Sequence, residues 1–177
     1  MHGALNAFPP QDIRAFLQLS AGDWLALRSL LGPDAPDRTA ASFDGGAQLG
    51  DDCQDWHQSD RGELSVRFLE PQDATECGGL EVALPSGSTL QLHFRSDGTV
   101  VMPRQSGRWQ LTADGSLELE LLEQGRWLKE RIWFSKPNLR LRCTLEQTPD
   151  GQPGRASFSS EIRRLRPAGE ASASSVA

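Results

Sequence analysis

The sequence predicts an all-β fold, an antiparallel up-and-down barrel of about ten strands with one short helix near the N-terminus. Turn signals such as Asp97-Gly98 and Asp114-Gly115 recur through most of the chain, and apolar and polar side chains alternate between them. Alternation with a period of two, bounded by turn residues, is typical of strands. Many short, locally connected strands favour a closed barrel, which leaves no exposed sheet edge. A double-sheet sandwich is the alternative.

The helix is predicted for residues 11–19. Ile13, Phe16 and Leu17 recur there at helical spacing, which indicates an amphipathic helix of two or three turns. The segment Ser20-Ala21-Gly22 follows and ends the helix.

The strands fill the rest of the chain, and the clearest alternation lies in residues 64–68, 90–95 and 139–146. Eight to ten strands can close around one ligand, as lipocalin-like barrels do. The predicted strands begin near Gly22, Gly62, Gly79, Thr89, Thr99, Gly107, Ser116, Arg126, Leu139 and Arg155.

Two segments lack this alternation. Residues 32–60 are rich in Gly, Asp and Pro and predict a long loop, and residues 167–177 are small and polar and predict a disordered tail. A length of 177 residues fits one ordinary domain. We therefore expect a single barrel domain over residues 1–166.

Composition excludes several classes of protein. A net charge of −6 argues against a nucleic-acid partner, which a basic face would attract. Cys53, Cys77 and Cys143 are an odd number with no CxxC pair, which fits a reducing compartment and predicts no disulfide framework and no metal site. No stretch is apolar enough for membrane insertion and no signal peptide is evident, so we expect a cytoplasmic or plastid-stroma protein.

The usual signatures of nucleophilic, phosphate-binding and metalloprotease sites are missing. The chain contains no GxSxG elbow, P-loop, GxGxxG after a strand, or HExxH. A barrel that holds a small molecule is therefore the favoured reading, rather than one that works through a metal or an acyl nucleophile.

Charged residues are densest in segment 130–142, which predicts strand, tight turn, strand and places Arg140 and Arg142 on one face. If 148–154 is a hairpin loop, Glu161 lies opposite Arg142 or within one residue of it. Because leucines usually face the core, alternation alone favours a solvent-facing ion pair of small energetic value. The alternative is that the arginines face a polar interior and grip the carboxylates of an anionic ligand.

The chain has five tryptophans and no tyrosine. Trp24 and Arg28 are four residues apart and share a face whether the segment is strand or helix. An aromatic ring beside a guanidinium suits a flat, conjugated, acid-bearing ligand. A surface contact between Trp24 and Arg28 explains the spacing equally well. Trp109, which precedes a leucine-rich strand, fits a core position.

These segments resemble a known family. Residues 130–134 (ERIWF) followed by 137–142 (PNLRLR) are similar to the signature of the S/U-type, CpcS/CpeS-like phycobiliprotein chromophore lyases. Residues 20–24 (SAGDW) with Arg28-Ser29 resemble the family's N-terminal segment, and residues 156–163 resemble its closing strand. The likeness runs from about Phe16 to Arg163, is strong over the last third of the chain and is weak between about Leu30 and Ser88.

The resemblance implies a lipocalin-type barrel like that of fatty-acid-binding proteins, with a bilin, an open-chain tetrapyrrole, carried in its mouth. The bilin, phycocyanobilin or phycoerythrobilin, would be attached through a thioether to a cysteine of an apo-phycobiliprotein subunit. The nucleophile would then belong to the partner, and no metal is implied.

The resemblance also implies roles for eight residues and reverses the outward orientation that alternation favours. Arginines would bind the bilin propionates, a glutamate would hydrogen-bond the pyrrole nitrogens and donate a proton, and tryptophans would stack on the tetrapyrrole. The residues are Arg28, Arg140 and Arg142 for the propionates, Glu130 and Glu161 for catalysis, and Trp24, Trp56 and Trp133 for stacking.

One departure keeps an accessory role open. Relatives commonly carry histidine after the Arg-Ser pair, where this chain has Leu30-Leu31-Gly32-Pro33, which would fit a non-catalytic accessory subunit of a heteromeric lyase. A lipophilic-ligand carrier without transfer activity is a separate alternative to the active lyase. A second lyase subunit or a second copy of the chain is a further expected partner.

Overall fold

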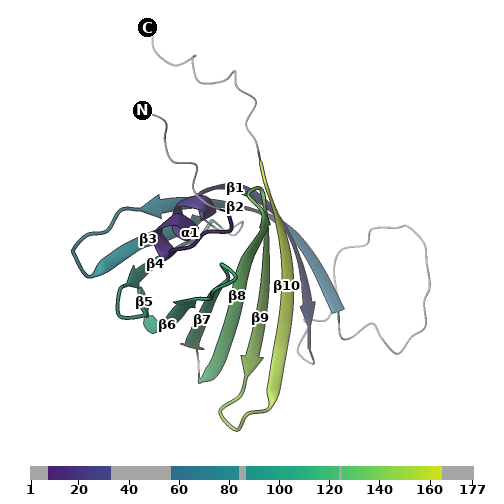
Figure 1. Ribbon diagram of the computed structural model, residues 1–177. Helices are drawn as coiled ribbons and strands as arrows, with labels where there is room; N and C mark the ends of the chain where they lie inside the picture. Colours follow the sequence, from purple (N-terminus) through teal and green to yellow (C-terminus); the bar gives the residue numbers. More distant parts are fainter. Residues whose placement is uncertain (1–7, 33–56, 84–86, 124, 165–177) are drawn as a thin grey trace, which may run out of the picture.

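The barrel is closed, as the sequence predicts. The computed structural model describes residues 8–32, 57–83, 87–123 and 125–164, which form ten antiparallel strands and one helix (Figure 1). Each strand pairs with the next along the chain, and β1 pairs with both β2 and β10 to close the barrel. The elements are α1 (Ile13–Ser20), β1 (Gly22–Leu31), β2 (His57–Leu69), β3 (Glu76–Ala83), β4 (Thr89–Arg95), β5 (Thr99–Met102), β6 (Gln105–Leu111), β7 (Leu117–Glu123), β8 (Arg126–Lys136), β9 (Leu139–Gln147) and β10 (Pro153–Arg163).

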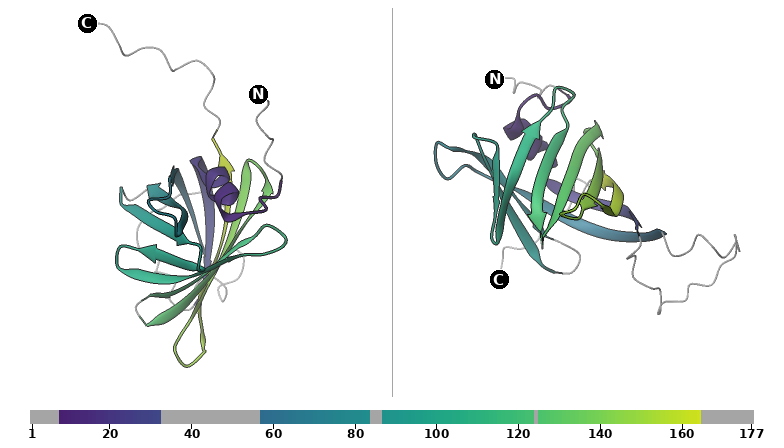
Figure 2. Two further views of the ribbon diagram at one scale, coloured as in Figure 1. Left: turned by 60° about the vertical axis from the view of Figure 1, so that its left-hand side comes forward. Right: turned by 90° about the horizontal axis from the view of Figure 1, so that it is seen from below.

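The helix α1 closes one end of the barrel (Figures 1 and 2). Asp12 caps it, because its carboxylate accepts a hydrogen bond from the backbone N–H of Ala15 at 2.8 Å. Phe16 and Leu17 are fully buried, and the ring of Phe16 lies 5.2 Å from that of Phe134. The apolar stripe seen in the sequence therefore packs onto the barrel core.

The apolar core gathers around that end. It contains large side chains from the helix and from most strands, all at most 9% exposed. The opposite end, which we call the mouth, is where β1 and β9 finish and where β2, β8 and β10 begin. The buried apolar residues are Phe16, Leu17, Trp24, Val66, Leu80, Leu92, Phe94, Val100, Met102, Leu117, Leu119, Leu121, Ile132 and Phe134.

One predicted loop is shorter than expected. Leu31 pairs with His57, so residues 57–60 belong to β2 rather than to the predicted loop 32–60. Residues 33–56 and the predicted tail, 167–177, lie outside the described residues. No helix in the described ranges has the length and apolar content needed to cross a membrane.

The hairpin between β9 and β10 has a different register from the predicted one. Gln147 pairs with Pro153, which shortens the connection, and a register shift follows between Pro153 and Ala156. Without this irregularity the pairing of Gln147 with Pro153 would place Glu161 opposite Leu139, and the one-residue shift moves its partner to Arg140. Glu161 thus lies opposite a position two residues from Arg142, whereas the prediction placed it opposite Arg142 or within one residue of it.

Candidate functional site

The inner face of β9 and β10 is polar, the reverse of the usual barrel pattern. The orientation favoured by alternation alone, with arginines facing solvent, is therefore wrong, and the orientation implied by the resemblance is the one observed. These side chains are buried or line the cavity described below. A barrel interior that holds a ligand need not be apolar. They are Arg140, Arg142, Thr144 and Glu146 of β9 and Arg155, Ser157, Ser159 and Glu161 of β10.

A buried ion pair forms the floor of this polar stripe. Nε of Arg140 donates to Oε2 of Glu161 at 2.5 Å, and both side chains are at most 3% exposed. A charge removed from water in this way is tolerated only with a close counter-charge. The two residues are therefore mutually dependent.

Arg142 extends the pair into a network. Its Nη1 donates to Oε1 of Glu130 at 3.1 Å, and its Nε lies 3.4 Å from Oε1 of Glu161. The hydroxyl of Thr144 also donates to Glu130, at 3.2 Å. Two arginines and two glutamates thus alternate along the wall, so that each charge has an opposite neighbour.

The network leaves donor capacity unused. Among the described residues, the buried Nη2 of Arg140 and Nε of Arg142 have no hydrogen-bond partner. Buried polar groups are nearly always hydrogen-bonded in native proteins. Of the two, Arg142 lines the cavity, so a ligand there could supply an acceptor to it, whereas Arg140 lies beneath the lining.

The two arginines differ in their protonation equilibria. Burial lowers the pKa of Arg140 to about 10, against the opposing effect of Glu161. Burial also disfavours the charge of Arg142, but Glu130 and Glu161 outweigh it and raise the pKa of Arg142 above its ordinary value. Both guanidiniums remain charged at neutral pH.

Trp24 supports the floor from below. Its ring is fully buried, its indole N–H donates to the carbonyl of Ser20 at 2.9 Å, and the guanidinium of Arg140 lies 4.6 Å from its centroid. The guanidinium of Arg163 lies 4.3 Å from the same ring. Arg163 also donates to the carbonyls of Leu19 and Ala21, where α1 ends. The helix end, Trp24 and the ion network are therefore one continuous packing unit.

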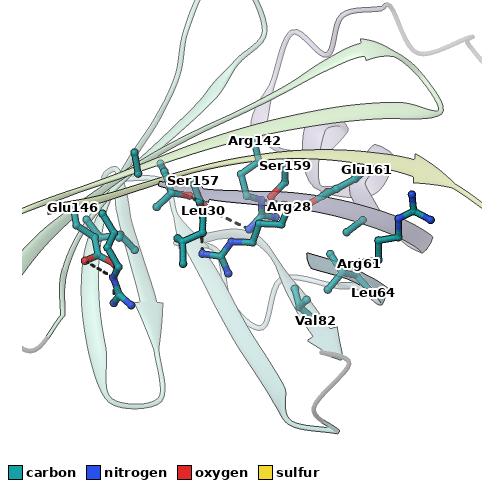
Figure 3. A pocket seen from close by; sticks show the side chains of 17 residues that line it. Arg28, Leu30, Arg61, Leu64, Val82, Arg142, Glu146, Ser157, Ser159 and Glu161 are labelled. Carbon is teal, nitrogen blue, oxygen red and sulfur yellow. Dashed lines mark hydrogen bonds and ion pairs between the residues drawn. The ribbon is translucent and has the colours of Figure 1, made fainter. Parts of the chain in front are cut away.

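Above this floor lies a cavity of about 620 Å³ (Figure 3). Its apolar side is formed by small and aliphatic residues of β1, β2, β3 and β8, and its polar side by the stripe of β9 and β10. Arg28, Arg142, Ser157 and Ser159 gather at its centre in Figure 3. The volume lies within the range of small-molecule sites. The apolar lining residues are Ala26, Leu30, Leu64, Val82 and Leu128.

The cavity is richer in positive charge than the chain as a whole. Its lining contains four arginines and three glutamates, in a protein of net charge −6. Arg28 is exposed, with a long hydrogen bond of 3.5 Å to the hydroxyl of Ser157. Glu146, near the mouth, is held by Arg126 at 3.3 Å and by Arg155 at 3.2 Å. The arrangement suits an elongated, partly apolar anion.

A second hollow of about 600 Å³ is lined mainly by outward-facing side chains of β7, β8 and β9. Its charged residues are largely paired with one another, as Arg131 is with Asp114 at 2.6 Å and Lys129 with Glu120 at 3.4 Å. Trp133 and Cys143 also line it. Glu130 is the one member of the buried ion network among the described residues that line this hollow; Arg140, Arg142 and Glu161 do not line it.

The structure brings together five of the eight predicted site residues. Glu130, Glu161, Arg28 and Arg142 line the cavity, and Arg140 lies beneath it against Glu161.

Two of the three predicted stacking residues do not line the cavity. Trp24 is buried beneath Arg140, because it belongs to the core that α1 covers. Trp133 lies on the outer face, since Ile132 and Phe134 on either side of it point inward. Trp56 lies outside the described residues.

Sequence reasoning missed three charged lining residues, Arg61, Glu146 and Arg155. For Glu146 and Arg155 the signal was present, because they continue the alternation that places Arg142 and Glu161 inside. Alternation was also sufficient to place Trp133 on the face opposite Glu130, three residues away.

Comparison with known proteins shows the family. A sequence model of the CpeS-like protein family matches residues 83–164. "Chromophore lyase CpcS/CpeS 1" of Paulinella chromatophora is 38% identical over 162 residues, which span 90% of this chain and 92% of that protein. "Chromophore lyase CpcS/CpeS 1" of Synechocystis is 32% identical over 119 residues, 67% of this chain and 56% of that relative.

Solved structures share the fold. The S-type phycobiliprotein lyase CPES of Guillardia theta aligns with a TM-score of 0.61 at 20% sequence identity, covering 86% of this chain and 92% of that chain. A DUF3598 protein of unknown function from Nostoc punctiforme aligns with a TM-score of 0.54 at 14% identity, covering 84% of this chain and 49% of that chain. With a relative that matches along nearly its whole length, the chain belongs to the CpcS/CpeS-like family of chromophore lyases.

Proposed function

We propose that the protein binds an open-chain tetrapyrrole, a bilin, in the cavity and attaches it through a thioether to a cysteine of a phycobiliprotein subunit. The observation that carries this proposal is the network of two arginines and two glutamates on the wall of a partly apolar cavity. A bilin presents the matching chemistry, since it has an extended conjugated body, two propionates and a row of pyrrole nitrogens. Phycocyanobilin and phycoerythrobilin are the bilins expected.

The arginines bind and orient the ligand in this proposal. Arg28 and Arg142 line the cavity with guanidiniums that pair well with carboxylates, so they receive the propionates. Arg140 lies deeper and fixes Glu161 through the 2.5 Å contact. The apolar side of the cavity, including Leu64 and Leu128, contacts the conjugated rings.

The glutamates act on the pyrrole nitrogens. Glu130 and Glu161 line the same wall, and their carboxylates accept hydrogen bonds from pyrrole N–H groups. Such bonds stabilise the protonated, cationic bilin, in which the ethylidene carbon of ring A is a better electrophile. The thiolate of the partner adds to that carbon, a C–S bond forms, and a proton enters the conjugated system. The thiol and the bilin combine without a leaving group.

The nucleophile is the partner's cysteine. Cys143, the half-buried cysteine of β9, sits on the outer face and not in the cavity. The acceptor subunit supplies the thiol at the mouth. We place the reaction in the cytoplasm or plastid stroma, where apo-phycobiliproteins and reduced thiols coexist. A second lyase subunit is a further partner in this proposal.

A carrier barrel without transfer activity is the second candidate. A single anion clamp is sufficient to hold a fatty acid, whereas this cavity has two glutamates interleaved with the arginines. Interleaved carboxylates repel an anionic chain unless it also donates hydrogen bonds, as a bilin does. The network therefore favours the lyase over the carrier.

The test is bilin binding and transfer by matched variants. The protein is incubated with phycocyanobilin, its visible absorbance is recorded, and candidate apo-subunits are added. The covalent product is then read as bilin fluorescence on a denaturing gel. We expect Arg142→Gln to weaken binding at least about tenfold, as the loss of a charged hydrogen bond predicts. Glu130→Gln is expected to slow transfer about 100-fold while binding is largely kept.

The control is Arg131→Gln on the outer face of the same strand, which leaves the cavity lining unchanged. Binding without transfer to any subunit, by the wild type, would favour the carrier. Transfer that appears only when a related lyase subunit is added would favour the accessory-subunit reading.

A further inference from the structure

Three inward side chains lie in one row across the barrel wall. Ser159 of β10 is in register with Arg28 of β1 on one side and with Arg142 of β9 on the other. Neighbouring strands lie about 4.8 Å apart, and residues in register point to the same face of the sheet. All three residues line the cavity, where Figure 3 shows them close together. We call Arg28, Ser159 and Arg142 the cross-strand row.

Each member of the cross-strand row has a donor that the protein does not fully use. Ser159 is only 5% exposed, and its hydroxyl makes no hydrogen bond within the part of the chain that the structure describes. The buried Nε of Arg142 has no hydrogen-bond partner there either. Arg28 makes one long hydrogen bond, of 3.5 Å, to the hydroxyl of Ser157. Three adjacent strands thus offer donors to one acceptor in the cavity.

The cross-strand row also contains a positive charge that no described carboxylate balances. The ion network below it is balanced in itself, since it has two arginines and two glutamates. Arg28 stands outside that network and has no carboxylate partner among the side chains that the structure describes. One carboxylate placed at the row by a ligand would balance this charge and accept from all three residues.

We propose that Ser159 selects a ligand with a free carboxylate, because its hydroxyl donates to that carboxylate between Arg28 and Arg142. The inference rests on the proposed function for the identity of the ligand, whose propionates supply the carboxylate. A hydrogen bond to a charged acceptor is stronger than one to a neutral acceptor. An ester in the same place has no charge, so it gains less from the hydroxyl and from the guanidiniums.

A carboxylate fixed at this level also orients the ligand along the cavity. The row lies between the floor, where Arg140 contacts Glu161, and the mouth, where Arg155 contacts Glu146. The propionates of a bilin are attached to its central rings. Holding one of them at Ser159 therefore leaves an outer ring toward the mouth, where the acceptor thiol arrives.

The first test compares phycocyanobilin with its dimethyl ester. Dissociation constants are measured by visible absorbance for the wild type, for Ser159→Ala and for the matched control Ser160→Ala. The control makes the same change at the next residue of β10, on the outer face. We expect Ser159→Ala to weaken binding of the free acid about tenfold and binding of the ester less than about twofold. Ser160→Ala should change neither.

An equal loss of affinity for acid and ester in Ser159→Ala would overturn the proposal, because the hydroxyl would then contribute only to the shape of the cavity. An unchanged affinity for the free acid would overturn it as well.

The second test needs no bilin. Ser159→Asp places a carboxylate of the protein itself in the cross-strand row. The matched variant Thr144→Asp places one beside Glu130, which accepts from the Thr144 hydroxyl at 3.2 Å. We expect Ser159→Asp to melt no lower than the wild type, because its carboxylate meets two guanidiniums, and Thr144→Asp to melt lower, because two like charges are then adjacent. Ser159→Asp should also weaken binding of phycocyanobilin at least about 100-fold.

A Ser159→Asp variant that melts as far below the wild type as Thr144→Asp would overturn the proposal, because the row then does not accept a carboxylate. If the wild type binds neither the acid nor the ester, the proposed function fails, and the melting comparison alone decides whether the row is a carboxylate site.

Discussion

At the residue scale, Arg140 connects the helix to the cavity. It pairs with Glu161, stacks on Trp24, and leaves Nη2 without a partner among the described residues. A buried arginine held on two sides can present a fixed donor to a ligand without first being ordered. The fully buried Trp24 therefore supports Arg140 from below and does not line the cavity.

Removing the charge of Glu161 should destabilise the fold. Glu161→Gln leaves Arg140 buried without its counter-charge, and breaking such a pair costs about 3–5 kcal/mol. Urea unfolding monitored by tryptophan fluorescence measures the change. The exposed Glu63→Gln, which loses only its surface contact with Arg164, should cost about 1 kcal/mol or less. Equal losses for the two variants would contradict the burial argument.

Gly22 occupies a position that tolerates no side chain. Its φ is +138°, and a Cβ there would meet the Nη1 of Arg163, whose guanidinium is held by the carbonyls that end α1. We expect Gly22→Ala to lower the free energy of unfolding by at least about 2 kcal/mol. Gly151→Ala, also at positive φ but with open space around it, should lose about 1 kcal/mol. Thermal unfolding of both variants checks the difference.

At the element scale, strand bounds were predictable because turn chemistry is local. Asp97 accepts a hydrogen bond from the backbone N–H of Thr99 at 2.9 Å, and Gly98 adopts φ +83°, so the dipeptide marked a real turn between β4 and β5. The start of β2 and the register of β10 were not predictable. The start of β2 depends on the pairing of His57 with Leu31, and the register of β10 depends on the shift after Pro153. Both are properties of two paired strands and not of one segment's sequence.

The direction of β9 shows a second limit. Alternation correctly separated Arg140 and Arg142 from the leucines, but it does not say which set faces inward. The usual preference for leucine inside fails here because the interior holds a polar cavity. The resemblance implies that the arginines face inward, as they do. It also gives Trp133 a stacking role in the cavity, which conflicts with the alternation, because Trp133 and Glu130 lie on opposite faces of β8.

The turn that joins β6 and β7 should be sensitive to acid. The carboxylate of Asp114 accepts from the hydroxyl of Thr112 at 2.5 Å and from the N–H of Ser116 at 3.0 Å, and these bonds lower its pKa below the ordinary 3.8. A carboxylate with a lowered pKa stabilises the fold above its ordinary pKa, and this stability is lost as pH falls through the lowered value. We expect Asp114→Asn to be less stable than the wild type at neutral pH.

The difference between the two proteins should shrink steadily below about pH 4, as the native carboxylate takes up its proton. Free energies of unfolding measured across this range test the expectation. A difference that is constant from neutral pH into strong acid would show that the charge of Asp114 is irrelevant to the turn.

At the scale of the whole molecule, the barrel divides into two ends with different tasks. The helix end contains Phe16, Trp24 and Phe134 and carries most of the apolar burial. At the mouth end, the cavity and its charged lining take the place of packed apolar side chains. A small barrel can hold a ligand in this way because one end is stable enough to support the other.

The central claim is that the inner cavity, and not the outer hollow beside Trp133, is the bilin site. A crystal structure of the complex with phycocyanobilin tests it most directly. We predict the tetrapyrrole between Leu64 and the β9–β10 wall, with its propionates at Arg28 and Arg142. A bilin found against Trp133 on the outer face, with the inner cavity filled only by water, would contradict the account.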